Sequence, residues 1–425
     1  MKNEKLRVPK LRFKDFSGEW KEKYFGDIYS FLQTNSFSRA LLNYEDGNVK
    51  NIHYGDIHTK FKSNFYIQDE TVPYINQDVD LTKIKEENYC KEKDLVIADA
   101  SEDYKDIGKA IELIDLNNER LLAGLHTYIA RDDKDRIALG FSGYFMQTHN
   151  IRVQMMKMAT GISVLGISKG NLNKLELIIP QKQEQEKITS FLSSIDKKIN
   201  QLSKKDELLQ NYKKAMMQKI FSQKIRFKKA DGSDYPKWEE KKLVEISLKI
   251  SDGIHSTPTY DDKGLHYFIN GNNLEDGKIE IDEKTKKVSE KEFLKHRREL
   301  DNTTILLSIN GTIGKLAFYD NEKVLLGKSA CYINIDEKQA VKYFIYNVIK
   351  TQNIQSFFYS ELTGSTIKNL SLNTVKNTKI NLPSLEEQTK IANFLSSLDT
   401  KISQNKKALK ETQKFKKALL QKMFV

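Results

Sequence analysis

The sequence predicts an α+β protein in which two tandem mixed α/β domains are separated by two long repeated helices that pair as an antiparallel coiled coil. Three observations predict this architecture: a gapless internal repeat, a coiled-coil period within each copy of the repeat, and short apolar runs typical of buried strands elsewhere. The chain has 425 residues, enough for two or three domains that each bury a core.

The repeat sets the domain boundaries. Residues 180–221 and 383–424 align at a constant offset of 203, and 21 of the 42 positions are identical. The only two tryptophans, Trp20 and Trp238, each follow an Arg-Phe-Lys tripeptide, so the globular parts also begin alike. We therefore expect a first domain at 1–179, a helical segment at 180–224, a second domain at 225–382 and a second helical segment at 383–425.

Each helical segment carries one narrow apolar stripe. Its members are spaced 4, 3, 4 and 3 residues apart in the first copy and keep the same phase in the second: Ile188, Leu192, Ile195, Ile199 and Leu202, then Ile391, Leu395, Leu398 and Ile402. Asp206 interrupts the first stripe, where the register can shift. A helix of about 40 residues spans roughly 60 Å and is unstable alone. Pairing within the chain satisfies both stripes; a dimerisation helix or a plain scaffold is the alternative.

The intervening segments predict mixed α/β domains. Apolar runs at 95–98 and 305–308 are typical of buried strands, and Gly-containing turns such as Asn270-Gly271 and Asn310-Gly311 bound others. Apolar spacing near 139–158 and 337–360 indicates helices. The globular segments have diverged almost completely, whereas the helical ones have not.

Charge and composition narrow the class of protein. Lys and Arg number 70 against 58 Asp and Glu, and the net charge of +12 favours a polyanionic partner, nucleic acid first. Two isolated cysteines, Cys90 and Cys331, argue against a disulfide scaffold or a metal site. There is no apolar run of the ~20 residues that a bilayer requires and no signal-peptide pattern, so we expect a cytoplasmic protein without membrane contact.

No motif for catalysis is found. The sequence contains no phosphate loop, no glycine-rich nucleotide motif and no zinc-protease motif. Asp99, Glu102, Asp103 and Lys105 lie close together as in some nucleases, but a solvated loop is the simpler interpretation. We therefore predict no catalytic residue, no metal ligand and no cofactor in this chain.

Polar and basic residues mixed with aromatics are typical of DNA-binding loops. Asn suits adenine edges, Arg suits guanine edges, and Lys, Ser and Thr suit phosphates. Each such residue alone is better explained by a surface turn, but both domains contain them. We predict DNA contacts from Ser36, Arg39, His53, Tyr54, Asp56, His58, Lys109 and Thr160, and from His255, Thr257, Asn270, Asn272, Asn273, Asn310, Lys315, Ser365 and Thr366.

These features together resemble the specificity (HsdS) subunit of type I restriction–modification systems. The resemblance rests on IPQKQEQEKITSFLSSIDKKI and LPSLEEQTKIANFLSSLDTKI, on the KKAMMQKIF and KKALLQKMF endings, and on DGIHSTP and NGTIGKLAF in the second domain. The first domain departs from it, with ADASEDYKDIGKA where the second has SINGTIGKLA.

The resemblance implies a non-catalytic subunit. Each target recognition domain is expected to read one half of a bipartite DNA site, and the helix pair to set the gap. Two methylation (HsdM) subunits with S-adenosylmethionine would dock on the helices, and restriction (HsdR) subunits with ATP and Mg would join them. We expect exposed residues of the repeat, Gln185, Lys213, Gln388 and Lys416, to contact these partners, and Phe191 and Phe394 to pack in the apolar stripe.

Two other functions stay open from the sequence. A non-enzymatic bivalent adaptor could join two protein partners through its globular segments. Sequence-blind, salt-dependent DNA binding, or none, would favour that adaptor. An enzyme with an unfamiliar active site is the other alternative, and turnover by the purified chain alone would establish it.

Overall fold

The computed structural model describes residues 7–364 and 368–425. The chain divides into two compact units: unit 1 is Met1–Ser203 with Lys407–Val425, and unit 2 is Lys204–Lys406. The division therefore runs through both long helices rather than at their ends. Each unit combines one α/β domain with half of each helix.

The main sheet of unit 1 has the strand order β2-β11-β7-β9-β5, and both of its faces are covered. Its strands are β2 (Ser30–Leu32), β11 (Thr127–Arg131), β7 (Leu95–Ala98), β9 (Ala110–Asp115) and β5 (Asn64–Tyr66). In β7, Leu95 and Ile97 enter one core cluster and Val96 and Ala98 another. A strand buried on both faces reads as a continuous apolar run, so the predicted strand at 95–98 is confirmed.

A second, smaller sheet of unit 1 has the order β10-β4-β6-β3. Its strands are β10 (Leu121–Ala123), β4 (Lys50–Ile52), β6 (Tyr74–Ile75) and β3 (Leu42–Asn43). β10 and β4 run parallel. Together with α2 (Tyr54–Thr59), β4 and β10 supply the cluster on the second face of the main sheet.

Unit 2 repeats this plan with different side chains. Its main sheet has the order β15-β23-β20-β21, from β15 (Ser247–Asp252), β23 (Ala330–Ile335), β20 (Thr304–Ser308) and β21 (Leu316–Phe318). A smaller sheet, β19-β16-β22, consists of β19 (Lys287–Val288), β16 (His266–Ile269) and β22 (Val324–Leu326), with β16 and β22 parallel. The β16–β22 pair is the counterpart of β4–β10. In β20 the side chains again alternate between two clusters, which confirms the strand predicted at 305–308.

The helices predicted near 139–158 and 337–360 are present, but each is divided in two. The first comprises α3 (Phe141–Phe145) and α4 (His149–Met158), and the second α8 (Lys342–Ile349) and α9 (Gln352–Ser360). Thr148 and Thr351 adopt extended backbone conformations as N-caps, which interrupts the helical geometry.

The two long helices are α6 (Lys182–Phe221) and α11 (Leu385–Lys422). In unit 1 the start of α6 and the end of α11 share a core cluster, to which Ile188 and Leu419 belong. In unit 2 the end of α6 and the start of α11 share another, with Ile220 and Ile391. Each helix thus begins where the other ends, so the predicted antiparallel pairing is confirmed. Within the described part of the chain, no helix is long and apolar enough to cross a membrane.

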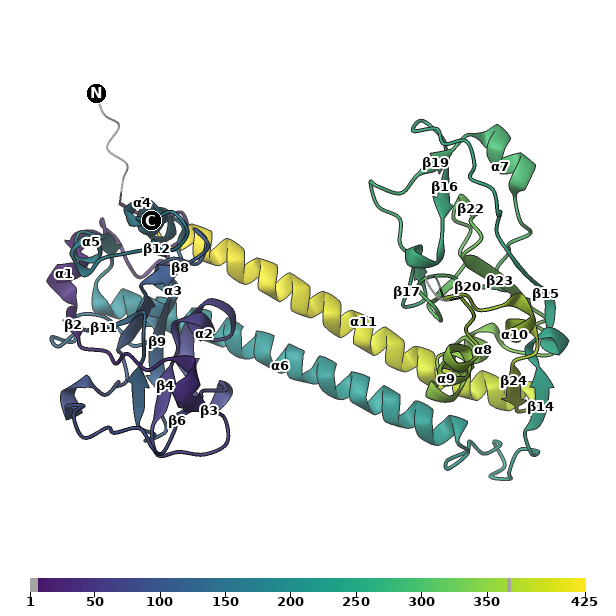
Figure 1. Cartoon of the computed structure of the whole chain (residues 1–425), viewed down its shortest axis with the longest axis horizontal. Helices are drawn as coiled ribbons and strands as arrows, with labels where there is room; N and C mark the ends of the chain where they lie inside the picture. Colours follow the sequence, from purple (N-terminus) through teal and green to yellow (C-terminus); the bar gives the residue numbers. More distant parts are fainter. Residues whose placement is uncertain (1–6, 365–367) are drawn as a thin grey trace. The chain divides into compact units, whose positions relative to one another are not determined.

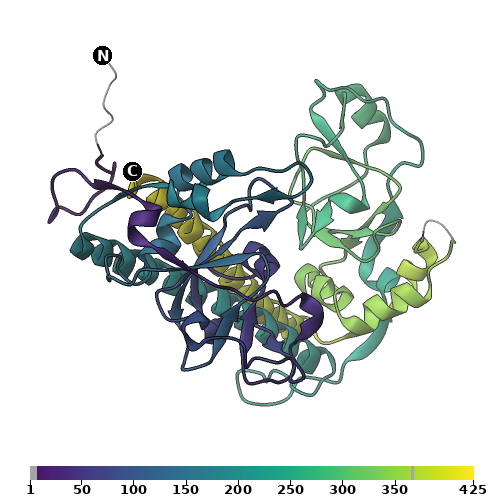
Figure 2. The same cartoon turned by 60° about the vertical axis from the view of Figure 1, so that its left-hand side comes forward.

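The C-terminus of the chain completes the core of unit 1. Figure 1 and Figure 2 both show the last turns of α11, in yellow, lying against the first domain. Phe424 packs edge-on against Trp20, with ring centroids 6.3 Å apart, and contacts Phe141 and Phe145. The equivalent residue of the first repeat, Phe221, is partly buried and packs against the core of unit 2, with its ring next to that of Phe344.

A buried carboxylate near the start of each long helix explains why Arg-Phe-Lys and Trp recur. Glu184 accepts hydrogen bonds from Arg12 Nε at 2.8 Å and from Trp20 Nε1 at 3.3 Å. Glu387, at the equivalent position, accepts hydrogen bonds from Arg226 and from Trp238 Nε1, the latter at 3.1 Å. The repeat therefore encodes the same tertiary contact twice, one in each unit.

Candidate nucleic-acid interface

In the first domain, most of the predicted DNA-binding residues lie around the N-terminus of α2. His53 follows β4, and its Nδ1 accepts the Gly55 N–H at 3.1 Å, which caps the helix. Arg39 Nη2 lies 3.2 Å from the same nitrogen and donates to Asp56 Oδ1 at 3.0 Å. Lys109 Nζ donates to the carbonyl of His58 at 2.8 Å. The structure thus brings together six of the predicted residues around α2, although Asp56 is buried: Arg39, His53, Tyr54, Asp56, His58 and Lys109.

Electrostatics favour the neutral form of His53. Partial burial, followed by the neighbouring Arg39 charge, lowers the pKa of this imidazole. Because Nδ1 accepts, the proton sits on Nε2, which can donate to a ligand. Asp56 is almost fully buried and is paired with both Arg39 and Lys60. The cluster therefore combines a neutral donor with one buried carboxylate that is paired with two cations, which leaves one positive charge in excess.

Two predicted residues of the first domain lie outside this cluster. Ser36 is exposed in the loop before η1 (Arg39–Leu41). Thr160 closes a separate loop through backbone hydrogen bonds to Gly166. The structure does not join either side chain to α2.

In the second domain, the equivalent place is the turn η5 (Gly271–Asn273), which follows β16. Asn270 Oδ1 accepts a hydrogen bond from Ser329 Oγ at 2.8 Å, and Asn273 Oδ1 accepts from the Asn270 N–H at 3.0 Å. The sequence prediction included the asparagines of this turn, Asn272 among them, but missed Ser329. Ser329 is equivalent to His126 at the repeat offset of 203 residues. In the sequence, only the faint repeat around Gly124 and Gly327 indicates this equivalence.

The remaining predicted residues of the second domain are scattered. Lys315 pairs with Glu275, and Asn310 Nδ2 donates to the Lys328 carbonyl at 3.3 Å. His255 pairs with Asp252 at 2.8 Å, and Thr257 is exposed in the same loop. Ser365 and Thr366 lie outside the described residues.

The prediction that Gln185 and Gln388 are exposed partner contacts is wrong. Their relative exposures are 1% and 0%. Gln185 Oε1 accepts the Ala138 N–H at 2.9 Å, and Gln388 Oε1 accepts the Val341 N–H at 2.8 Å. Each amide also donates to the carbonyl of the proline that precedes its helix. A buried amide needs such partners, so these glutamines fasten each helix to its own domain.

Lys213 and Lys416 are used within the helix pair. Lys213 Nζ lies 2.5 Å from Asp399 Oδ1 in unit 2, and Lys416 Nζ lies 2.6 Å from Asp196 Oδ1 in unit 1. Both lysines are less than a quarter exposed, so the expected exposed contacts are instead partly buried ion pairs between the helices. Phe191 and Phe394 make their ring contacts with Phe13 and Phe227, 5.8 Å away in each case. The repeated aromatics thus hold the Arg-Phe-Lys segments, which the stripe prediction did not include.

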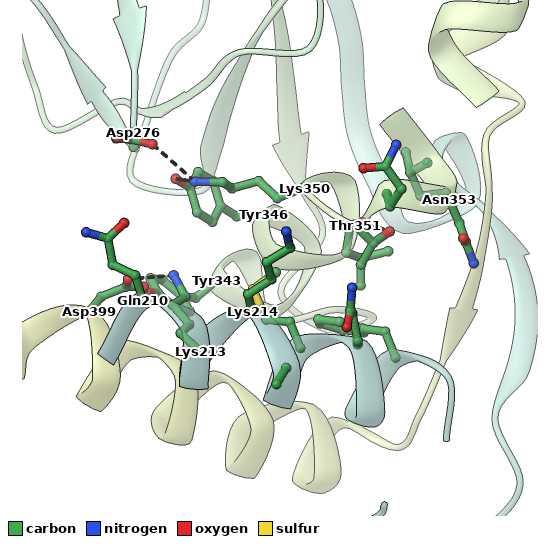
Figure 3. A pocket seen from close by; sticks show the side chains of 18 of the residues that line it. Gln210, Lys213, Lys214, Asp276, Tyr343, Tyr346, Lys350, Thr351, Asn353 and Asp399 are labelled. Carbon is green, nitrogen blue, oxygen red and sulfur yellow. Dashed lines mark hydrogen bonds and ion pairs between the residues drawn. The ribbon is translucent and has the colours of Figure 1, made fainter. Parts of the chain in front are cut away.

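Unit 2 also contains a groove between its domain and its parts of the two helices. Figure 3 shows Lys213 and Lys214 on α6, Asp399 on α11, and Lys350 with Asp276 on the domain side. The groove has a volume of about 1580 Å³, above the roughly 300–1,000 Å³ typical of small-molecule sites. It therefore does not have the dimensions of a typical cofactor site.

The fold and the candidate interface define a class of protein: two unlike α/β binding domains carried by a repeated antiparallel helix pair. Residues 18–210 and 235–413 match the family model described as the type I restriction modification DNA specificity domain. The chain belongs to this family.

Individual relatives agree with the family. A Methanocaldococcus jannaschii protein provisionally named the MjaX type I restriction enzyme specificity subunit is 26% identical over 370 residues, covering 80% of this chain and 82% of the relative. The MjaVIII specificity subunit of the same organism is 25% identical, covering 65% and 68%.

A solved structure shares the fold over nearly the whole chain. The S subunit of a type I restriction–modification system from M. genitalium superposes with a TM-score of 0.61 at 17% identity, covering 98% of this chain and 99% of that one. A chain from a study of type I system assembly and conformational transition gives a TM-score of 0.54 at 14% identity, covering 95% and 97%.

Proposed function

We propose that this chain gives a type I restriction–modification complex its DNA sequence specificity, with each α/β domain reading one half of a bipartite site. One observation carries the proposal. The residue that follows β4 in the first domain is His53, and the residue that follows the equivalent strand β16 in the second domain is Asn270. The contacts that hold the long helices to their domains, by contrast, are the same in both units. A protein that recognises two different half-sites needs different side chains in its two DNA-binding loops, while the supporting structure can be the same in both domains.

The scaffold also supports a proposal about partners. Two equivalent helical halves offer two equivalent surfaces, so two copies of one methylation (HsdM) subunit can bind an asymmetric chain. In this proposal the adenine-N6 methylation, with S-adenosylmethionine, belongs to those subunits. ATP- and Mg-dependent cleavage belongs to restriction (HsdR) subunits. This chain itself is non-catalytic, binds none of these cofactors and acts on DNA in the cytoplasm.

The test is a genome-wide map of N6-methyladenine in a host that carries this chain with its methylation subunit. We expect a bipartite methylated motif that disappears when this chain alone is removed. Methylation that persists unchanged would contradict the proposal and favour a protein–protein adaptor.

Exchanging one domain tests whether the readers are independent. Replacing residues 1–160 with the matching segment of a relative should change one half of the motif and leave the other half intact. A change in both halves would contradict independent reading.

A further inference from the structure

Buried polar atoms without partners gather beside α2. Among the residues that the structure describes, those with a buried side-chain atom lacking a hydrogen bond include Asn51 (Nδ2), Asp56 (Oδ2), His58 (Nδ1) and Asp99 (Oδ1). All four belong to α2 or to segments packed around it. Because buried polar groups in folded proteins nearly always have partners, these four atoms leave hydrogen-bonding capacity unused in the segments around α2.

Asp99 is not part of a solvated loop, contrary to the sequence interpretation. It follows β7 directly, and its side chain is only 20% exposed. His126 Nδ1 lies 3.3 Å from Asp99 Oδ1, although hydrogen-bond geometry is not met. The Asp99 N–H also donates to the His126 carbonyl at 3.1 Å. A backbone hydrogen bond thus joins the two residues, and their side chains lie next to each other.

His126 is held in a strained conformation with its ring accessible. Its φ of 59° lies in the left-handed region, which non-glycine residues rarely adopt. The turn is fixed by the Gly124 N–H, which donates to the Ile52 carbonyl at 2.9 Å, and by Thr127 Oγ1, which donates to the Gly124 carbonyl. The side chain is 47% exposed, and its ring centroid lies 5.4 Å from that of Tyr54. Backbone strain of this kind is found mainly at functional sites, where a side chain has to keep one orientation.

The second domain has the same backbone frame with other side chains on it. The Ile309 N–H donates to the Ser329 carbonyl at 3.0 Å, as the Asp99 N–H does to His126. The Gly327 N–H donates to the Ile269 carbonyl at 2.8 Å, as the Gly124 N–H does to Ile52. Ile309 therefore occupies the place of Asp99 and is buried. One frame thus carries an acidic acceptor in the first domain and an apolar residue in the second.

We propose that Asp99 and His126 determine specificity in the first half-site by reading a base that offers an exocyclic amino group, cytosine or adenine, in the major groove. The inference rests on the proposed function. An ionised carboxylate only accepts hydrogen bonds, so it selects cytosine N4 or adenine N6 and rejects the carbonyl acceptors of guanine and thymine. His126 orients the carboxylate through their contact and presents its ring beside Tyr54 at the same surface.

The experiment uses the full chain with its methylation subunits and DNA duplexes substituted one base pair at a time within the mapped motif. The variants are Asp99→Asn, which keeps the shape but adds a donor, and His126→Asn, which tolerates the left-handed backbone. Glu102→Gln, an exposed acid three residues further along the chain, is the matched control.

We expect the wild type to discriminate about ten- to a hundred-fold at the base pair that Asp99 reads. Asp99→Asn should lose that discrimination at this one base pair and keep it at every other position, and the control should match the wild type. A folded Asp99→Asn chain that keeps the full pattern, or loses affinity equally for all sequences, would overturn the inference. If Asp99→Asn does not fold, His126→Asn decides by the same criterion. A wild type that discriminates nowhere would instead refute the proposed function.

Discussion

Truncating Phe424 should destabilise unit 1 although this residue is the penultimate residue of the chain. Phe424 is 6% exposed, and its ring contacts those of Trp20, Phe141 and Phe145. Burial of an aromatic side chain removes about 200 Å² of surface from water, and the substitution by alanine loses most of this buried area. At roughly 25 cal/mol per Å², the transfer contribution lost is about 3–4 kcal/mol. The cavity left behind gives an expected total of about 3–5 kcal/mol for Phe424→Ala.

The assay must report on unit 1 alone, because a chain of two units need not unfold in one step. Hydrogen exchange at the buried amides of β7 meets this need, and a melting transition of unit 1 should fall by roughly 10 °C. Phe415→Ala is the matched control, since Phe415 lies on α11 nine residues before Phe424 but is 53% exposed. If the β7 amides exchange no faster in Phe424→Ala than in Phe415→Ala, the C-terminus does not complete this core and the reasoning is refuted.

Three further outcomes are expected. Removing the Lys416–Asp196 ion pair one partner at a time and together should give a coupling energy of about 1 kcal/mol in urea unfolding; zero coupling would show that the pair does not stabilise the helices. Glu184→Gln, which weakens the buried contact with the Arg-Phe-Lys segment, should cost about 2–4 kcal/mol, whereas the exposed Glu186→Gln should stay within about 0.5 kcal/mol; equal effects would contradict the role of the buried carboxylate. Burial raises the pKa of Glu112 to about 7, so the folded carboxyl keeps its proton where the unfolded one, with a pKa near 4.5, has lost it. This group therefore lowers the stability of unit 1 as pH rises from about 4.5 to about 7, by roughly 3 kcal/mol in all. Glu112→Gln should gain stability relative to the wild type between pH 5 and pH 8, and an unchanged difference in Tm would contradict the raised pKa.

The scaffold contacts occur twice because the sequence that makes them is duplicated. Glu184 and Glu387 hold Arg and Trp side chains, Gln185 and Gln388 accept a backbone N–H, and each of the two ion pairs joins an aspartate of one long helix to a lysine of the other. The loops that we propose to read DNA do not repeat in this way, although their backbone hydrogen bonds do. In the proposed function, variation in the loop side chains can therefore change the recognised sequence without disturbing the scaffold.

The sequence by itself determined the elements whose signal is local or periodic. The 203-residue offset, the 4-3 spacing of the apolar stripes and the continuous apolar run of β7 each predict structure because side-chain periodicity follows directly from helix and strand geometry. The sequence also predicts that His53, Tyr54 and Asp56 lie close together, because these residues are neighbours in the chain.

Only the tertiary structure decided which polar residues are buried and which meet across the chain. Gln185 looked like a surface residue because a polar side chain on a helix usually faces water, yet it is the partner of a backbone N–H from another segment. Asp99 looked like part of a charged loop, and its contact with His126 depends on a turn held by β4. Burial and long-range hydrogen bonds depend on the positions of segments far apart in sequence, and no local pattern specifies them.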